Sequence, residues 1–97
     1  MSRVILLPEA REDVLEAFGW YEKERRGLGK VFRAALNQAI RRIRTTPFAA
    51  QIVYRDLRRV IVQRFPYGVF YRVMPQAIVV VAVVHGHRAP TAWMRRA

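Results

Sequence analysis

Residues 77–84 are apolar at all eight positions, and this run constrains the fold more than any other stretch of the chain. A strand with one face in water alternates apolar and polar side chains, whereas a strand covered on both faces is continuously apolar. The run is also far shorter than the roughly 20 residues that a helix needs to cross a bilayer. It therefore predicts an interior strand over residues 78–85, in a chain that does not span a membrane.

Two segments nearer the N-terminus carry apolar residues at helical spacing. The first helix is predicted to begin at Pro8 and to break at Gly27-Leu28-Gly29, and its apolar face comprises Ala10, Val14, Ala17, Phe18 and Tyr21. The second is predicted over residues 30–44, ending at Thr45-Thr46-Pro47, and its face comprises Phe32, Ala35, Leu36, Ala39, Ile40 and Ile43. A length of 97 residues with no repeat or flexible linker indicates one domain over residues 1–97.

Further strands are predicted over residues 3–7, 58–65 and 67–74, and a short one is possible over residues 51–54. Two helices can cover only one face of the resulting sheet. The other face must then meet the C-terminal segment, a second subunit or a binding partner. The fold inferred from the pattern is incomplete until that face is covered.

Charge is distributed unevenly along the chain. Residues 1–24 contain three basic and six acidic side chains, whereas residues 25–97 contain fifteen basic side chains and only Asp56 as an acid. Segment charges of −3 and +14 add to the net charge of +11, and arginine supplies 16 of the 18 basic residues. This asymmetry favours an acidic partner, either a nucleic acid or an acidic protein segment. A solvated basic surface that maintains solubility is the alternative.

Several function classes are excluded by what the sequence lacks. It contains no cysteine, which excludes a disulfide framework, a zinc–thiolate site and a thiol nucleophile. It also has no Gly-rich phosphate loop, no nucleophile elbow and no paired carboxylates after residue 24, so kinase, ATPase, glycosidase and serine-hydrolase functions fail. The apolar stretch before Pro8 is too short for a signal peptide, and a cytoplasmic location is therefore expected.

His85, His87 and Arg88 follow the predicted interior strand and form the first candidate site. A catalytic zinc site uses about three protein ligands, so two histidines in an acid-poor region predict neither a metal nor another cofactor. A histidine at a strand end could act as a general acid or base in RNA cleavage. It could equally be a structural hydrogen-bonding residue.

Arg64, Tyr67, Tyr71 and Arg72 form a second candidate site across the predicted hairpin. Aromatic rings interleaved with arginines can stack on bases and neutralise phosphates. Alternate residues from Tyr67 to Val73 share one face of the strand. The two tyrosines could therefore also be half-buried strand residues with polar tips.

The C-terminal residues Trp93, Arg95 and Arg96 form the third candidate site. A tryptophan this close to the end of the sequence is either a packing anchor on the sheet or an interface residue that fills a pocket on a target. Arginines cannot be buried without a partner. Arg95 and Arg96 are therefore expected to face solvent or a binding partner.

Taken in order, these segments resemble the RelE/ParE superfamily of toxins from bacterial type II toxin–antitoxin modules. The matching pieces are Leu6-Leu7-Pro8-Glu9-Ala10, Arg64-Phe65-Pro66-Tyr67, Phe70-Tyr71-Arg72, the apolar run with His85, and His87-Arg88 followed by Pro90 and Trp93. The resemblance implies an α+β fold in two layers, ordered β-α-α-β-β-β, with a helical hairpin on a mostly antiparallel sheet. It also implies a hetero-oligomer with a cognate antitoxin, whose acidic segment wraps the toxin.

The superfamily has two functional branches, and the resemblance favours the ParE-like branch of the plasmid-stabilisation type, which inhibits DNA gyrase. The RelE-like branch cleaves mRNA on the ribosome and carries an arginine directly after the hairpin aromatic, where this chain has Gly68. It carries a lysine pair on the preceding strand, where this chain has Arg59 and Ile61. A tyrosine near its C-terminus is replaced by Trp93, and only Arg88 matches a ribonuclease position well.

The two branches assign different roles to the candidate residues. If the chain is a ribonuclease, the resemblance implies catalysis by His85, His87 and Arg88. Otherwise the residues expected to bind the target or the antitoxin are Arg64, Tyr67, Tyr71, Arg72, Arg88, Trp93, Arg95 and Arg96. A basic module that binds nucleic acid without sequence preference is a further alternative, and its affinity would fall steeply with salt.

Overall fold

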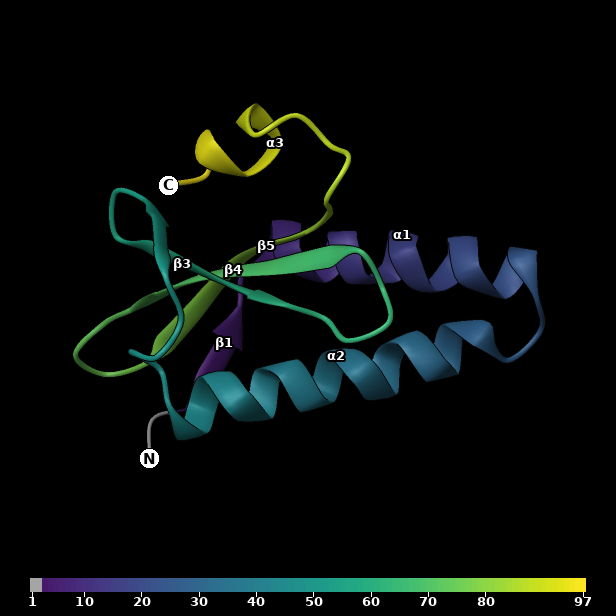
Figure 1. Ribbon diagram of the computed structural model, residues 1–97, viewed down its shortest axis with the longest axis horizontal. Coiled ribbons are helices and arrows are strands. Elements are labelled where there is room, and N and C mark those ends of the chain that lie inside the picture. Colours follow the sequence, from purple (N-terminus) through teal and green to yellow (C-terminus); the bar gives the residue numbers. More distant parts are fainter. Residues whose placement is uncertain (1–2) are drawn as a thin grey trace.

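The computed structural model describes residues 3–97 as a two-layer α+β fold (Figure 1). The elements are β1 (Val4–Leu6), α1 (Pro8–Glu24), α2 (Leu28–Thr45), β2 (Ile52–Tyr54), β3 (Leu57–Ile61), β4 (Tyr67–Val73), β5 (Ile78–His85) and α3 (Thr91–Met94). The five strands form one sheet in the order β1-β5-β4-β3-β2. Among the strands of residues 3–97, only β1 and β5 pair in parallel. The predicted helical hairpin on a mostly antiparallel sheet is confirmed.

The α1–α2 hairpin closes more tightly than the sequence suggested. Its turn contains Gly27, whose φ of 88° suits a residue without a Cβ, and α2 begins directly after it at Leu28. The prediction that Gly29 breaks the helix is wrong, because Gly29 is buried inside the first turn of α2. A Cβ at Gly29 would come within 2.8 Å of the Phe18 carbonyl oxygen, so glycine is what allows α1 and α2 to approach here.

The start of α2 is held by a carboxylate on α1. Glu22 accepts hydrogen bonds from the backbone N–H groups of Gly27 at 3.2 Å and Gly29 at 2.8 Å. These bonds favour the ionised carboxylate and lower the pKa of Glu22 below its ordinary value. Because the first N–H groups of a helix have no partner within the helix, Glu22 satisfies donors that would otherwise be free.

Strand β5 is buried on both faces, as its apolar run predicted, although β4 rather than β5 is the central strand. Its ladder with β4 contains a bulge. Phe70 pairs with Ala82 and Tyr71 with Val80, so that Val81 is the extra residue on β5. Val80 then joins the core beneath the helices, whereas both Val81 and Ala82 join the core on the other side.

The strand predicted over residues 58–65 is shorter in the structure, because β3 ends at Ile61. The chain turns at Arg64, which has a φ of 71°. Val62 and Phe65 are buried and point into the core beneath the helices, where they continue the apolar pattern without continuing the strand. The backbone N–H of Val62 donates to the carbonyl of Tyr67 and closes this turn.

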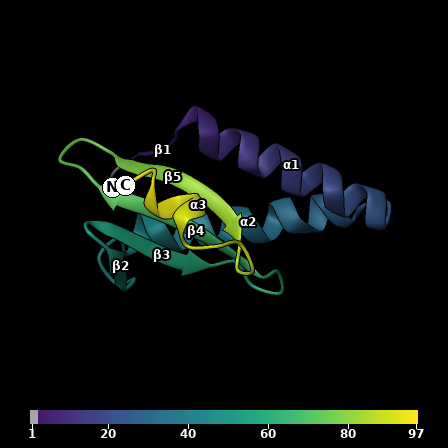
Figure 2. The same ribbon diagram turned by 90° about the horizontal axis from the view of Figure 1, so that it is seen from above.

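The two faces of the sheet are covered by different parts of the chain. Helices α1 and α2 cover one face, and α3 lies on the opposite face (Figure 2). On that second face Trp93 stacks on Phe70 and joins a core with Leu57, Val81 and Val84. The sequence allowed the C-terminal segment, a second subunit or a binding partner to cover this second face, and in the structure the C-terminal segment covers it. Within residues 3–97, neither α1 nor α2 has an apolar stretch long enough to cross a membrane.

Candidate functional site

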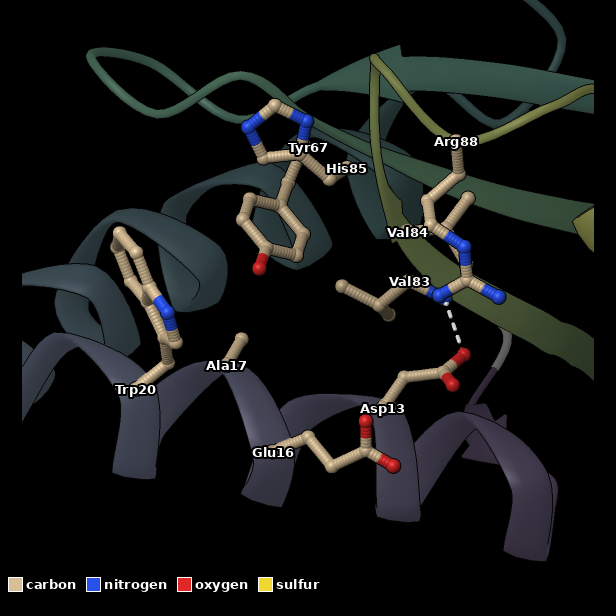
Figure 3. A pocket seen from close by; sticks show the side chains of 9 residues that line it. All are labelled: Asp13, Glu16, Ala17, Trp20, Tyr67, Val83, Val84, His85 and Arg88. Carbon is tan, nitrogen blue, oxygen red and sulfur yellow. Dashed lines mark hydrogen bonds between the residues drawn. The ribbon is translucent and has the colours of Figure 1, made fainter.

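Two grooves meet at the C-terminal end of β5. The first, the sheet groove, lies on the face that carries α3 and has a volume of about 230 Å³. The second, the helix groove, lies between α1 and the end of β5 and has a volume of about 300 Å³ (Figure 3). Both grooves are lined by Tyr67, Val84, His85 and Arg88. A ligand in either groove would therefore touch residues that also belong to the other.

The sheet groove is lined by cations and by no acidic residue. Arg59 and Arg88 lie on its rim, and Trp93 forms part of its wall. Its floor includes Gly68, where a Cβ would come within 3.0 Å of the Phe70 ring and 3.2 Å of Cδ of Arg59. Because glycine has no side chain, nothing at position 68 fills the bottom of the groove. The groove therefore suits an anionic group or an acidic partner segment.

The structure brings His85 and His87 together, but not on one face of a strand. β5 ends at His85, whose Nδ1 accepts a hydrogen bond from the backbone N–H of His87 at 2.9 Å. The His85 ring also packs edge-on against Tyr67, with centroids 5.3 Å apart. His85 therefore has a structural role at the end of the strand, and only its Nε2 remains for other chemistry. Within residues 3–97, no three potential ligands gather to hold a metal ion.

The four hairpin candidates do not form one surface. Tyr71 is fully buried beneath the helices, and its hydroxyl donates to the carbonyl of Pro47 at 2.6 Å. The expectation that Tyr71 contacts a partner is therefore wrong. Tyr67 lies on the same face, as the alternation predicted, but it is half-buried and lines both grooves. Burial raises the pKa of both hydroxyls.

The two hairpin arginines point to different places. Arg72 lies on the sheet face opposite Tyr71, as the alternation predicted, and pairs with Asp56 at 3.0 Å. This hydrogen bond lowers the pKa of the Asp56 carboxyl. Arg64 is exposed in the turn before β4 and borders a separate hollow beside α2. Neither arginine lines the sheet groove or the helix groove.

The two C-terminal arginines also differ from each other. Arg95 is exposed, as expected. Arg96 is mostly buried and paired within the chain, because its guanidinium donates to both oxygens of Asp13, at 2.6 and 3.2 Å, and to the carbonyl of Val81 at 3.1 Å. The same carboxylate accepts the backbone N–H of Val83 at 2.9 Å. The expectation for Arg96 was wrong because its carboxylate partner lies 83 residues earlier in the chain.

The helix groove contains residues that the sequence did not identify as candidates. Asp13, Glu16 and Trp20 line its α1 wall. Acidic residues at the start of a helix ordinarily complement the helix dipole, so their presence in the sequence gives no indication of a groove. One signal was available, because Trp20 falls outside the apolar stripe of α1 and is therefore expected on the surface.

Comparison with known proteins agrees with this fold. The family model of the ParE toxin of type II toxin–antitoxin system, parDE, matches residues 4–90. The structure is similar to a solved chain from the chromosomal ParDE TA system of P. aeruginosa, with a TM-score of 0.63, 14% identity, and coverage of 88% of this chain and 96% of that one. Comparison with curated proteins gives no significant match. The resemblance seen in the sequence is confirmed, and the chain belongs to the ParE toxins of type II toxin–antitoxin systems.

Proposed function

We propose that this toxin, when free of its antitoxin, stops growth by acting on DNA gyrase, and that the sheet groove contacts the target. The observation that carries the proposal is the composition of this groove. It combines Arg59 and Arg88 with an aromatic wall and no carboxylate. Such a groove can bind an acidic segment of gyrase or the DNA that gyrase holds.

Gly68 favours this target over the ribosome. Cleavage of RNA needs groups that neutralise the scissile phosphate and groups that carry protons. Gly68 stands where the ribonuclease branch of the superfamily carries an arginine, and Nδ1 of His85 is occupied by the amide of His87. Arg88 can neutralise the charge of a phosphate. The sheet groove, however, offers few groups beside it that can transfer a proton.

Neutralisation by an antitoxin follows from the charge of the chain. Fifteen basic side chains lie within residues 25–97, and in the part of the chain that the structure describes only Arg72 and Arg96 form ion pairs. An acidic antitoxin segment would gain charge-assisted hydrogen bonds from these arginines and would be steered toward them at long range. We therefore propose that an acidic segment of the antitoxin covers part of this basic surface in a hetero-oligomer.

Controlled expression of the toxin without its antitoxin tests the target. Trapped complexes of gyrase with cleaved DNA, together with continued translation at first, would support the proposal. Arg59→Ala and Arg88→Ala should each reduce growth inhibition, whereas Arg41→Ala, an exposed arginine on α2, serves as the matched control. Primer extension on an abundant message covers the alternative. Codon-positioned mRNA cleavage that disappears in Arg88→Ala would overturn the gyrase proposal.

A further inference from the structure

One row of side chains on the second face of the sheet has a gap in it. Ile61 on β3 pairs with Gly68 on β4, and Gly68 pairs with Val84 on β5. The three residues therefore lie side by side across the sheet, with no side chain at the middle position. We call this hollow the Gly68 gap. A glycine inside a strand often marks a place where a ligand or another chain approaches closely.

The C-terminal segment leaves the Gly68 gap open. In the neighbouring row, Trp93 covers Phe70, which is only 2% exposed. Ile61 points to the same face but is 54% exposed. Figure 2 shows the reason, because α3 lies over β4 and β5 and beside β3. Phe70 is thus covered from within the chain, whereas Ile61 is not.

Ile61 is held in place although its side chain is exposed. Its carbonyl accepts a hydrogen bond from the guanidinium of Arg42 at 2.9 Å, and its backbone is paired with that of Gly68. A surface that is already ordered loses little conformational entropy when a partner covers it. Ile61 therefore offers a fixed apolar contact at the edge of the gap.

Two arginines near the gap are available to bind carboxylates. Arg59 lies in the row of Phe70, and both Arg59 and Arg88 line the sheet groove that contains the gap. Within residues 3–97 the ion pairs are formed by Arg72 and Arg96, so no acidic side chain engages Arg59 or Arg88. An apolar floor beside two cations fits an apolar side chain that has acidic neighbours in its own sequence.

The same features argue against a nucleic acid in this groove. Phosphates would pair with the arginines but would leave the apolar floor at Ile61 without a matching group. A base would need an open aromatic face to stack on, and Trp93 is already stacked on Phe70 and packed edge-on against Tyr54. The groove, at about 230 Å³, is also smaller than the roughly 300–1,000 Å³ of pockets that enclose a small molecule. Its size fits a single side chain.

We propose that the Gly68 gap binds one apolar side chain of the target protein, such as leucine, from a segment whose own carboxylates pair with Arg59 and Arg88. The inference rests on the proposed function for the contact of the sheet groove with the target. It adds that a protein segment makes this contact, rather than the DNA that gyrase holds. Burial of Ile61 supplies affinity, and the two arginines select acidic segments.

Two short peptides test this chemistry without gyrase. In the first, leucine stands between two pairs of glutamates, and in the second, alanine replaces the leucine. An NMR titration should show that the leucine peptide binds roughly tenfold more tightly, because leucine adds three carbon atoms that the gap can bury. Ile61→Ser should abolish this preference. Ile52→Ser is the matched control, because Ile52 is 51% exposed on β2 and lines neither groove.

Purified gyrase without DNA tests the contact in the proposed target. The wild-type toxin and Ile52→Ser should bind it, whereas Ile61→Ser should bind roughly tenfold more weakly and inhibit growth less. Gly68→Ala should act in the same direction, because it keeps Ile61 but places a Cβ in the gap, 3.0 Å from the Phe70 ring. Circular dichroism establishes that each variant is folded, and either variant suffices if the other does not fold.

Four results would overturn the inference. In the first, the wild type binds the two peptides equally. In the second, Ile61→Ser keeps both gyrase binding and growth inhibition. In the third, Ile61→Ser loses antitoxin affinity but still inhibits growth fully, which would assign the gap to the antitoxin. In the fourth, affinity for a short DNA falls as much in Ile61→Ser as in Arg88→Ala, which would assign the gap to nucleic acid.

Failure of the gyrase proposal gives a different pattern. A toxin that prefers the leucine peptide through Ile61 but does not bind gyrase would refute gyrase as the target and support the inference for another protein. A toxin that binds gyrase without any preference between the peptides would refute the inference and leave the gyrase proposal intact.

Discussion

Trp93 lies nearly flat against Phe70, with ring centroids 4.3 Å apart and planes inclined by 17°. The contact fixes α3 on the sheet, because it joins Trp93 to the core that includes Phe70. It also sets the wall of the sheet groove. The packing of α3 and the proposed contact with the target thus depend on one side chain.

Trp93→Ala should therefore destabilise the protein. Complete burial would give a loss of about 3–5 kcal/mol, and because Trp93 is only partly buried we expect about 2 kcal/mol. Trp93→Phe should recover most of this loss by keeping a ring on Phe70. Urea unfolding measures both variants. An unchanged unfolding midpoint with lost growth inhibition would show instead that the ring serves the target alone.

The ion pair between Asp13 and Arg96 should contribute more than a surface pair. Their side chains are 13% and 18% exposed, and each also bonds to the backbone of β5. Arg96→Ala should lower the free energy of unfolding by about 2 kcal/mol, because it leaves a mostly buried carboxylate without its cation.

Arg95→Ala is the control for this pair, since an exposed arginine beside it should change stability by less than about 0.5 kcal/mol. A double-mutant cycle with Asp13→Asn isolates the coupling between the two side chains. Additive effects of the two single substitutions would contradict a direct interaction.

Two glycines on the helices should respond oppositely to alanine. A Cβ at Gly29 would clash with the Phe18 carbonyl oxygen and Cγ of Glu22, both at 2.8 Å, so Gly29→Ala should cost about 1–3 kcal/mol. Gly19 lies inside α1 with nothing within 4 Å of its Cβ position, so Gly19→Ala should stabilise by up to about 1 kcal/mol. Thermal unfolding of the two variants and the wild type measures both effects. Equal effects of the two would argue against the close helix approach.

Glu22 makes stability depend on pH in the acid range. Its pKa is lowered in the folded protein, so its contribution is present above the unfolded value of 4.5 and is lost as the pH falls through the folded value. At pH values below 4.5, the thermal midpoint of the wild type should therefore decrease by more than the thermal midpoint of Glu22→Gln does. Parallel curves for the two proteins from pH 7 to pH 3 would show that the carboxylate does not hold the start of α2.

Local patterns in the sequence predicted most of the fold. The spacing of apolar residues in α1 and α2 and the unbroken apolar run of β5 are short-range signals, and the structure follows them within a few residues. The apolar pattern extended the predicted strand too far, because it includes Val62 and Phe65. Both are apolar and buried, but the positive φ of Arg64 has turned the chain out of the strand.

The candidate site was harder to predict, because it depends on contacts between distant segments. Alternation showed that Tyr67 and Tyr71 share a face, but not that the helices cover this face. Nothing near Arg96 in the sequence indicates Asp13 as its partner. The helix groove likewise arises only when β1 ends early and leaves β5 beside α1.

The parallel pairing of β1 with β5 has a consequence for how the toxin is made. The first strand of the chain finds its neighbour only in residues 78–85, and the interior position of β5 links β1 to the other strands. A nascent chain that lacks these residues cannot close the sheet, because such long-range pairing forms late and exposes apolar surface until then. A ribosome translating this message therefore carries no folded toxin until residues 78–85 have been synthesised. An antitoxin already present in the cell can meet each new toxin molecule at the moment when its grooves first form.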